Sequence, residues 1–178
     1  MTDFERALHF VLKAEGGFTN DLHDHGGVTN RGILQREYTA WRRANGAADR
    51  SVKEITDAEA ADIYLHSYWL PAKCDRMAWP VCLAHFDAAV NTGLYQAAVF
   101  LQRVVGVKVD GVIGPVTLTA QASEISNLGA QQVAARLAEA RRPFYRHLAA
   151  TDPSQEEFLN GWLNRVDDVQ KLIKAEYV

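Results

Sequence analysis

The chain has 178 residues, of which 48% are hydrophobic, and a formal net charge of −3 with a pI of about 6.1. This length suffices for one well-buried core, whereas two independent domains would each be small, so we expect one compact monomeric unit over 1–178. The modest charge gives no reason to expect nucleic acid as the main partner. No apolar run reaches the roughly 18 residues of a membrane span, and Asp3, Glu5 and Arg6 interrupt the N-terminal segment. We therefore expect synthesis in the cytoplasm without a signal peptide, and no stable membrane insertion.

The first predicted helix leads from the N-terminus to a carboxylate. Thr2 and Glu5 have the spacing of a capping box, in which each side chain bonds a free backbone N–H of the first turn. Glu15 continues an apolar stripe of helical spacing and is expected to face the interior. Gly16 and Gly17 then end the helix. The stripe consists of Phe4, Leu8, Val11 and Leu12.

Glu15 and Asp24 are predicted to lie in different environments. At the end of a helix, burial and the negative end of the helix dipole both raise the pKa of the Glu15 carboxyl. Asp24 lies in a turn rich in Asn, Asp and Gly, before a short strand predicted at 28–29, where a carboxylate stays hydrated and ionised. The hydroxyl of Thr29 is suited to hold a water. Two carboxyl groups with separated pKa values are what a glycosidase uses as acid and base.

Each of these residues alone also fits an ordinary role. Glu15 would then be a solvated residue at a helix end, and Asp24 a common turn residue. The catalytic interpretation depends on their occurrence, together with Thr29, within one short segment.

Residues 15–21 (EGGFTND) and 24–33 (DHGGVTNRGI) resemble the signature of glycoside hydrolase family 108, the N-acetylmuramidase group common among phage endolysins. A second set of motifs resembles the predicted peptidoglycan domain usually fused behind it. These motifs are FDAAVNTG at 86–93, LQ at 101–102, DGVIGPVT at 110–117 and NGWLNRV at 160–166. The resemblance therefore divides the chain into a muramidase part, 1–75, and a helical peptidoglycan-domain-like part, 80–178.

The resemblance implies a role for each matching residue. Glu15 matches the catalytic glutamate of the family, and the order Glu, Asp, Thr is also similar to the triad of phage-type lysozymes, with Asp24 and Thr29 at the later positions. The spacing from Asp24 to Thr29 is one residue shorter than in that triad. Asp21 is a nearby carboxylate that remains an alternative for the second role.

The implied reaction is hydrolysis of the β-1,4 bond between N-acetylmuramic acid and N-acetylglucosamine in peptidoglycan glycan strands. Glu15 would protonate the glycosidic oxygen, and Asp24 with Thr29 would direct water to the opposite face, with inversion implied by the phage-type analogy. No cofactor or metal is required. The enzyme would act on the wall, in the periplasm, after release from the cytoplasm. Substrate contacts are expected from four residues: Phe18, Gln35, Asn91 and Tyr95.

Helices are predicted for most of the remaining chain, over about 34–46, 56–70, 81–92, 94–105 and 124–149, with a last helix starting at Asp152 and capped with Gln155. The expected fold class is mainly α, a lysozyme-like α+β fold in which a helical bundle faces a small β-element carrying Asp24. This fold is preferred over a muramidase with a separable wall-binding module, because the connector at 71–80 has no flexible Gly or Ser stretch.

Two side-chain groups near the C-terminus receive structural interpretations. Phe158 and Trp162 are expected to lie on the buried side of the last helix with Val166, Val169 and Ile173, as core and not as a sugar platform. A basic group on the preceding helix is expected to be a solvated face. It comprises Arg136, Arg141, Arg142, Arg146 and His147.

Two other functions remain open. His23, Asp24 and His25 are candidate ligands of a zinc-dependent wall amidase, although no third partner is evident. A non-catalytic wall-binding protein would instead use the turn at 110–117, which also fits a packing role. Cys74 and Cys82 match no common zinc pattern and are expected to be reduced, partly buried thiols.

Overall fold

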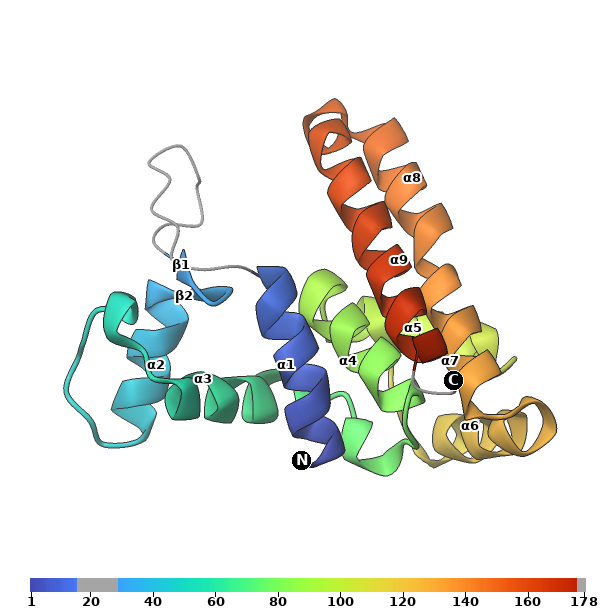
Figure 1. Ribbon diagram of the computed structural model, residues 1–178, viewed down its shortest axis with the longest axis horizontal. Helices are drawn as coiled ribbons and strands as arrows, with labels where there is room; N and C mark the ends of the chain where they lie inside the picture. Colours follow the sequence, from blue (N-terminus) through green and yellow to red (C-terminus); the bar gives the residue numbers. More distant parts are fainter. Residues whose placement is uncertain (16–28, 176–178) are drawn as a thin grey trace.

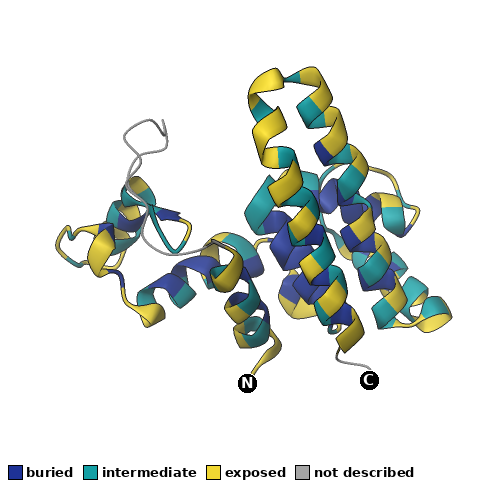
Figure 2. Cartoon of the chain, turned by 45° about the horizontal axis from the view of Figure 1, so that its top comes forward, coloured by how far each residue is buried: buried dark blue, intermediate teal, exposed yellow. Residues whose placement is uncertain are grey.

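The computed structural model describes residues 1–15 and 29–175 and is mainly α-helical (Figure 1). A small lobe holds β1 and β2 with two helices, α1 stands beside it, and the later helices form a larger bundle. Helices α8 and α9 form an antiparallel pair whose far ends extend beyond the bundle and are exposed (Figure 2). The elements are α1 Asp3–Glu15, β1 Thr29–Asn30, β2 Ile33–Leu34, α2 Gln35–Ala44, α3 Asp57–Tyr64, α4 Val81–Thr92, α5 Leu94–Val104, α6 Pro115–Leu128, α7 Ala130–Glu139, α8 Arg141–Thr151 and α9 Leu159–Ala175.

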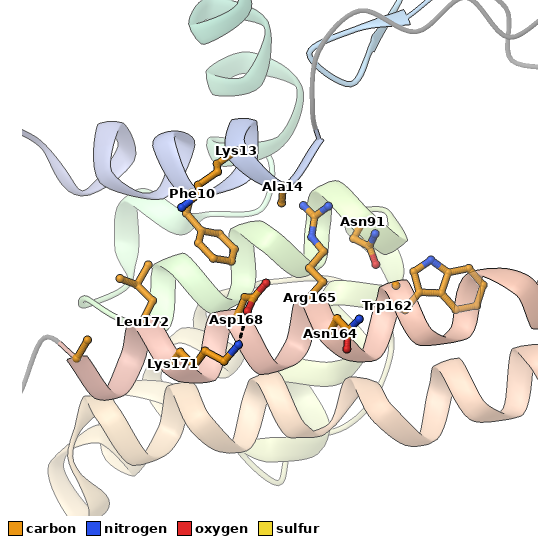
Figure 3. Close-up of a pocket in the computed structure, with 12 residues that line it drawn as sticks. Phe10, Lys13, Ala14, Asn91, Trp162, Asn164, Arg165, Asp168, Lys171 and Leu172 are labelled. Carbon is orange, nitrogen blue, oxygen red and sulfur yellow. Dashed lines mark hydrogen bonds and ion pairs between the residues drawn. The ribbon is translucent and has the colours of Figure 1, made fainter.

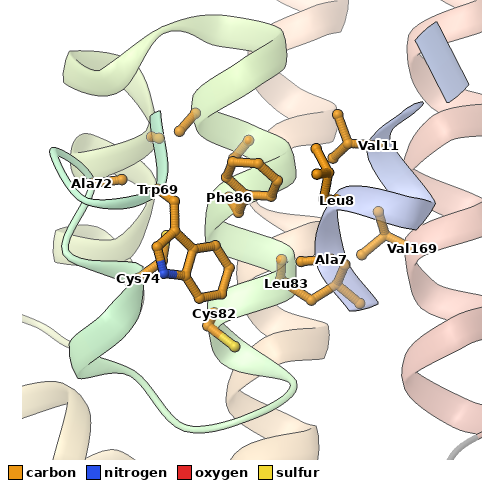
Figure 4. Close-up of a cluster of buried hydrophobic side chains, with 14 of the residues drawn as sticks. Ala7, Leu8, Val11, Trp69, Ala72, Cys74, Cys82, Leu83, Phe86 and Val169 are labelled. Atoms are coloured by element: carbon orange, nitrogen blue, oxygen red, sulfur yellow. The ribbon is translucent and has the colours of Figure 1, made fainter. Parts of the chain in front are cut away.

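Helix α1 is fixed at its start by the predicted capping box. The Thr2 backbone N–H donates to the Glu5 carboxylate at 2.7 Å, and the Glu5 N–H donates to the Thr2 hydroxyl at 3.2 Å. Its apolar side, with Ala7, Leu8 and Val11 buried, packs against α4. Figure 4 shows these side chains beside Leu83 and Phe86 of α4 and Val169 of α9. This packing sets the direction in which the C-terminal end of α1 points.

The predicted β-element is a two-stranded antiparallel hairpin with Thr29 opposite Leu34. Arg31 and Gly32 both have positive φ, +56° and +75°, as the tight turns that match the strand twist require. The Asn30 side-chain amide donates to the Val52 carbonyl at 3.1 Å, and the Tyr64 hydroxyl donates to the Arg31 carbonyl at 2.8 Å. The hairpin is thus attached to the small lobe through its backbone. Asp24 lies outside the described residues.

Helix α4 is the centre of the bundle. Every residue from Val81 to Ala89 is buried, and α4 packs against α1, α5 and α7. Such a helix has no solvent face, so its burial comes from neighbours on all sides and not from one apolar stripe. Cys82 on α4 and nearby Cys74 are free and fully buried, more completely than expected, and burial raises the pKa of Cys82 to about 12.

His85 on α4 makes the stability of this core depend on pH. Its side chain is completely buried, and burial lowers its pKa to about 4. The unfolded chain therefore binds a proton at His85 between pH 6.5 and 4 that the folded chain does not bind, so stability falls as pH decreases through this range.

We expect the free energy of unfolding to fall by about 3 kcal/mol by pH 4, and not to change above the ordinary histidine pKa. Denaturant unfolding from pH 7.5 to 4.5 measures it. His85→Leu should flatten this dependence and His147→Gln, at an exposed site, should not; equal profiles for His85→Leu and wild type would refute the assignment.

The C-terminal half is divided into more helices than the sequence indicated. The stretch predicted to be mostly helical at 124–149 is helical and belongs to three helices, because the chain turns at Gly129, which has φ +84°, and again at Ala140. Asp152 does cap, accepting from the Ser154 backbone at 3.0 Å, but it caps a 3-10 helix, Pro153–Phe158, that precedes α9. Gln155 does not complete a capping box; its side chain donates to the Ser154 hydroxyl.

The turn at 110–117 is built around the buried Gln102 of α5. The Gln102 Oε1 accepts from the backbone N–H groups of Asp110 and Gly111 at 3.0 and 2.9 Å. Its Nε2 donates to the Asp110 carboxylate at 2.7 Å and to the Val112 carbonyl at 3.0 Å. One side chain thus satisfies several polar groups of the turn. This geometry gives the motif a packing role.

We expect Gln102→Leu to cost about 2 kcal/mol, because the turn loses four hydrogen bonds and no other group of that shape replaces them. Amide hydrogen exchange at 110–112 should accelerate by more than global unfolding explains. Gln96→Leu on the same helix is the matched control and should leave exchange in the turn unchanged. Unaltered exchange in Gln102→Leu would show that the turn is held by other contacts.

Candidate functional site

An open cavity of about 740 Å³ lies between α1, α4 and α9 (Figure 3). Helix α1 contributes the side chains of Phe10, Lys13 and Ala14 near its C-terminal end. Helix α4 contributes Asn91 from its last turn, and α9 contributes several residues, among them Trp162 and Arg165. The Arg165 guanidinium points toward the end of α1 at Ala14 (Figure 3). The cavity therefore joins the first helix to motifs from the distant C-terminal part.

A buried ionic cluster lies behind this cavity. The Asp87 carboxylate, fully buried on α4, accepts from Arg141 Nη1 at 2.5 Å and from Arg165 Nε at 2.9 Å. Burial, the largest single influence, acts to lower the pKa of Arg141, but the charge of Asp87 and the interactions with Asp87 and Tyr145 together outweigh it, and the net shift is upward. The buried Asp87 carboxylate therefore pairs with two guanidinium groups, one from α8 and one from α9.

The cluster continues to the cavity through Tyr145 of α8. Arg141 donates from Nε and Nη2 to the Tyr145 hydroxyl, at 3.1 and 2.8 Å. The hydroxyl in turn donates to Asn91 Oδ1. The Tyr145 ring also stacks on Trp162, with centroids 5.2 Å apart. Two residues that line the cavity, Asn91 and Trp162, are thus held from behind by one tyrosine.

The structure brings some of the predicted site residues together and not others. Asn91 lines the cavity, and Glu15 is the last residue of α1, directly after the cavity residue Ala14. The Glu15 side chain lies outside the described part, as do Phe18, Asp21 and Asp24. Thr29 is half-buried in the hairpin.

Gln35 and Tyr95 are not among the residues that line this cavity. The Gln35 amide is occupied within the small lobe, where its Oε1 accepts from the Val52 N–H at 2.7 Å and its Nε2 donates to the Arg50 carbonyl at 3.0 Å. Tyr95 is 65% exposed at the start of α5, and its ring lies against Gly111. Gly111 has φ +76°, and an added Cβ there would come within 2.1 Å of that ring.

Sequence reasoning missed three residues of the site. Arg141 was expected on a solvated face, but it is completely buried because Asp87 neutralises it. Trp162 was expected in the core, yet it is only partly buried and lines the cavity, while Phe158 is 49% exposed. Arg165 received no role. A signal existed for Trp162 and Arg165, since both belong to the NGWLNRV motif.

Within 1–15 and 29–175, no group of three or more His, Cys, Asp or Glu side chains is arranged to hold a metal ion. His23, Asp24 and His25, the candidate zinc ligands, lie outside that range. Among the helices of the same residues, none combines the length and apolar character needed to cross a membrane.

Comparison with known proteins agrees with the geometry. Residues 8–93 match the family model of glycosyl hydrolase 108, and residues 96–167 match that of a predicted peptidoglycan domain. The structure of Brucella abortus SagA is similar to this chain, with a TM-score of 0.77 and 33% identity over 97% of this chain and 94% of that one. No match was found among curated proteins. These findings confirm the mainly α, lysozyme-like fold. The chain belongs to the glycosyl hydrolase 108 family and is a glycoside hydrolase that acts on peptidoglycan.

Proposed function

We propose that the enzyme is an N-acetylmuramidase whose general acid is Glu15 and whose glycan strand passes the cavity between α1, α4 and α9. One observation carries the proposal: the last turn of α1 brings Ala14 to the cavity, and the next residue, Glu15, is the last residue of that helix. The opposite wall carries Asn91, Trp162 and Arg165, which supply polar and aromatic contacts of the kind that sugars require.

The two family motifs act as one unit in this proposal, over residues 1–178. Supporting this, the hydrophobic cluster includes Leu8 and Val11 of α1 together with Leu83 of α4 and Val169 of α9. The cavity is likewise lined from both parts of the chain. A free muramidase part, 1–75, would expose the apolar face of α1 to water.

Asp24 and Thr29 are proposed to direct the attacking water. A base contributes more to the reaction than a hydroxyl that orients the water, so Asp24→Ala should lower kcat more than Thr29→Ala does, and Thr29→Ser should be close to wild type. Initial rates on purified peptidoglycan measure the difference. Asp21→Ala is the matched control. If it abolishes activity while Asp24→Ala does not, Asp21 is the second carboxylate.

The bond cleaved is tested by mass analysis of fragments from purified peptidoglycan. Reducing N-acetylmuramic acid ends support the proposal. Reducing N-acetylglucosamine ends would identify a glucosaminidase, and free peptide N-termini an amidase that uses His23 and His25. Binding without any released fragment would identify a wall-binding protein.

We further propose that the protein acts as a monomeric endolysin, made in the host cytoplasm and lytic at the wall after release. The resemblance of its motifs to those of phage endolysins supports this. Lysis of outer-membrane-stripped cells by the purified protein, with no lysis by Glu15→Gln, is the expected result.

A further inference from the structure

The side-chain amide of Asn91 has two chemically opposite ends, a carbonyl that accepts hydrogen bonds and an NH₂ group that donates them. Which end faces the cavity decides what Asn91 can bind there. The surrounding hydrogen bonds settle this orientation, since each neighbour must be able to donate or accept in the direction assigned to it.

The direction begins at Arg141, which can only donate. Its Nε and Nη2 both donate to the Tyr145 hydroxyl, so they occupy the lone pairs of that oxygen. Burial raises the pKa of Tyr145, and the hydroxyl keeps its single proton. Among the described residues, that proton has one remaining partner, the side chain of Asn91, which therefore accepts through Oδ1.

The Arg141 side chain is fixed in this orientation. Its side chain is fully buried, and Asp87, also fully buried, holds its Nη1 at 2.5 Å. Asp87 is itself fixed from the other side by Arg165. Hydrogen bonds therefore run outward from Arg141, to the Asp87 carboxylate on one side and through the Tyr145 hydroxyl to Asn91 Oδ1 on the other. Among the described residues, none accepts a hydrogen bond from Asn91 Nδ2.

We propose that Asn91 presents its NH₂ group to the glycan and binds an amide carbonyl oxygen of the substrate, and that Tyr145, Arg141 and Asp87 are positioning residues that fix this orientation. The inference rests on the proposed function and adds to it a specificity for acylated sugars. Both sugars of peptidoglycan carry an acetamido carbonyl, and where a stem peptide is attached, the lactyl group of N-acetylmuramic acid forms a second amide carbonyl.

The test pairs enzyme variants with matched substrates. Partly de-N-acetylated peptidoglycan is assayed before and after re-acetylation with acetic anhydride, and a third sample has its stem peptides removed to convert the lactyl amide into a carboxylate. Wild type should prefer the acetylated glycan by about tenfold in kcat/KM, the value of one hydrogen bond. If the rate falls on removal of the stem peptides and not on de-N-acetylation, the Asn91 NH₂ group binds the lactyl amide carbonyl instead of an acetamido carbonyl.

Asn91→Asp, which keeps the acceptor toward Tyr145 but offers no donor, should abolish the preference for acetylated glycan or reverse it toward the amine-bearing one. Tyr145→Phe should reduce the preference by releasing Asn91, while keeping the ring that stacks on Trp162. The matched control is Tyr38→Phe, which removes another buried hydroxyl, bonded to Arg50 and Glu59 in the small lobe, and should lower stability without changing the preference.

An unchanged preference in Asn91→Asp would overturn the inference, and an unchanged preference in Tyr145→Phe would overturn the positioning role. Neither result affects the muramidase assignment. That assignment fails separately, if wild type releases no N-acetylmuramic acid ends from the fully acetylated glycan.

Discussion

Replacing Glu15 with glutamine is expected to abolish glycan cleavage while the fold is retained. The amide has nearly the shape of the carboxyl group but cannot donate a proton to the leaving oxygen, and general acid catalysis contributes roughly a hundredfold to ten-thousandfold. The helix itself does not depend on this side chain, because its capping box lies at the other end and its buried residues precede it.

The measurement is the initial rate of fragment release, with thermal unfolding to show that the fold is kept. Glu5→Gln on the same helix is the matched control, since glutamine also serves in a capping box and the site is at the far end of α1. Activity of Glu15→Gln within about threefold of wild type would reject Glu15 as the general acid.

Elements defined by local signals could be predicted from the sequence. The Thr2 and Glu5 box starts α1, the Thr56 and Glu59 box starts α3, and Gly93 separates α4 from α5. Each signal acts within a few residues, where backbone hydrogen bonds and allowed φ angles decide the structure. The break between α6 and α7 at Gly129 has a similar local signal, a glycine with positive φ.

The site depends on contacts between distant parts of the sequence, and there prediction was weaker. Nothing near Arg141 indicates that Asp87 neutralises it, so its helix appeared basic and solvated. Gln35 also has contacts that the sequence does not show, since its side-chain amide is hydrogen-bonded to the backbone of Arg50 and Val52. Its expected contact with substrate stays a prediction.

The buried ionic cluster yields the second large effect. Asp87→Ala removes the buried carboxylate that pairs with the fully buried guanidinium of Arg141 and also with Arg165. Breaking a buried ion pair in this way typically costs about 3–5 kcal/mol. We expect a loss of that size in denaturant unfolding at pH 7, where His85 contributes no proton-linked change.

Asp167→Ala is the matched control, because Asp167 also pairs with an arginine, Arg142, but is half exposed. An exposed pair contributes up to about 1 kcal/mol, so this variant should unfold close to wild type.

The double variant Asp87→Asn, Arg141→Met removes charge of both signs from the interior and should recover part of the lost stability. A loss below about 1 kcal/mol in Asp87→Ala would mean that water or a rearranged side chain replaces the carboxylate. In that case Arg141 would be free to move, and Asn91 would not be held in one orientation. If the loss is instead about 3–5 kcal/mol, the Asp87 carboxylate both stabilises the fold and, through Arg141 and Tyr145, fixes the NH₂ group that Asn91 presents to a sugar carbonyl.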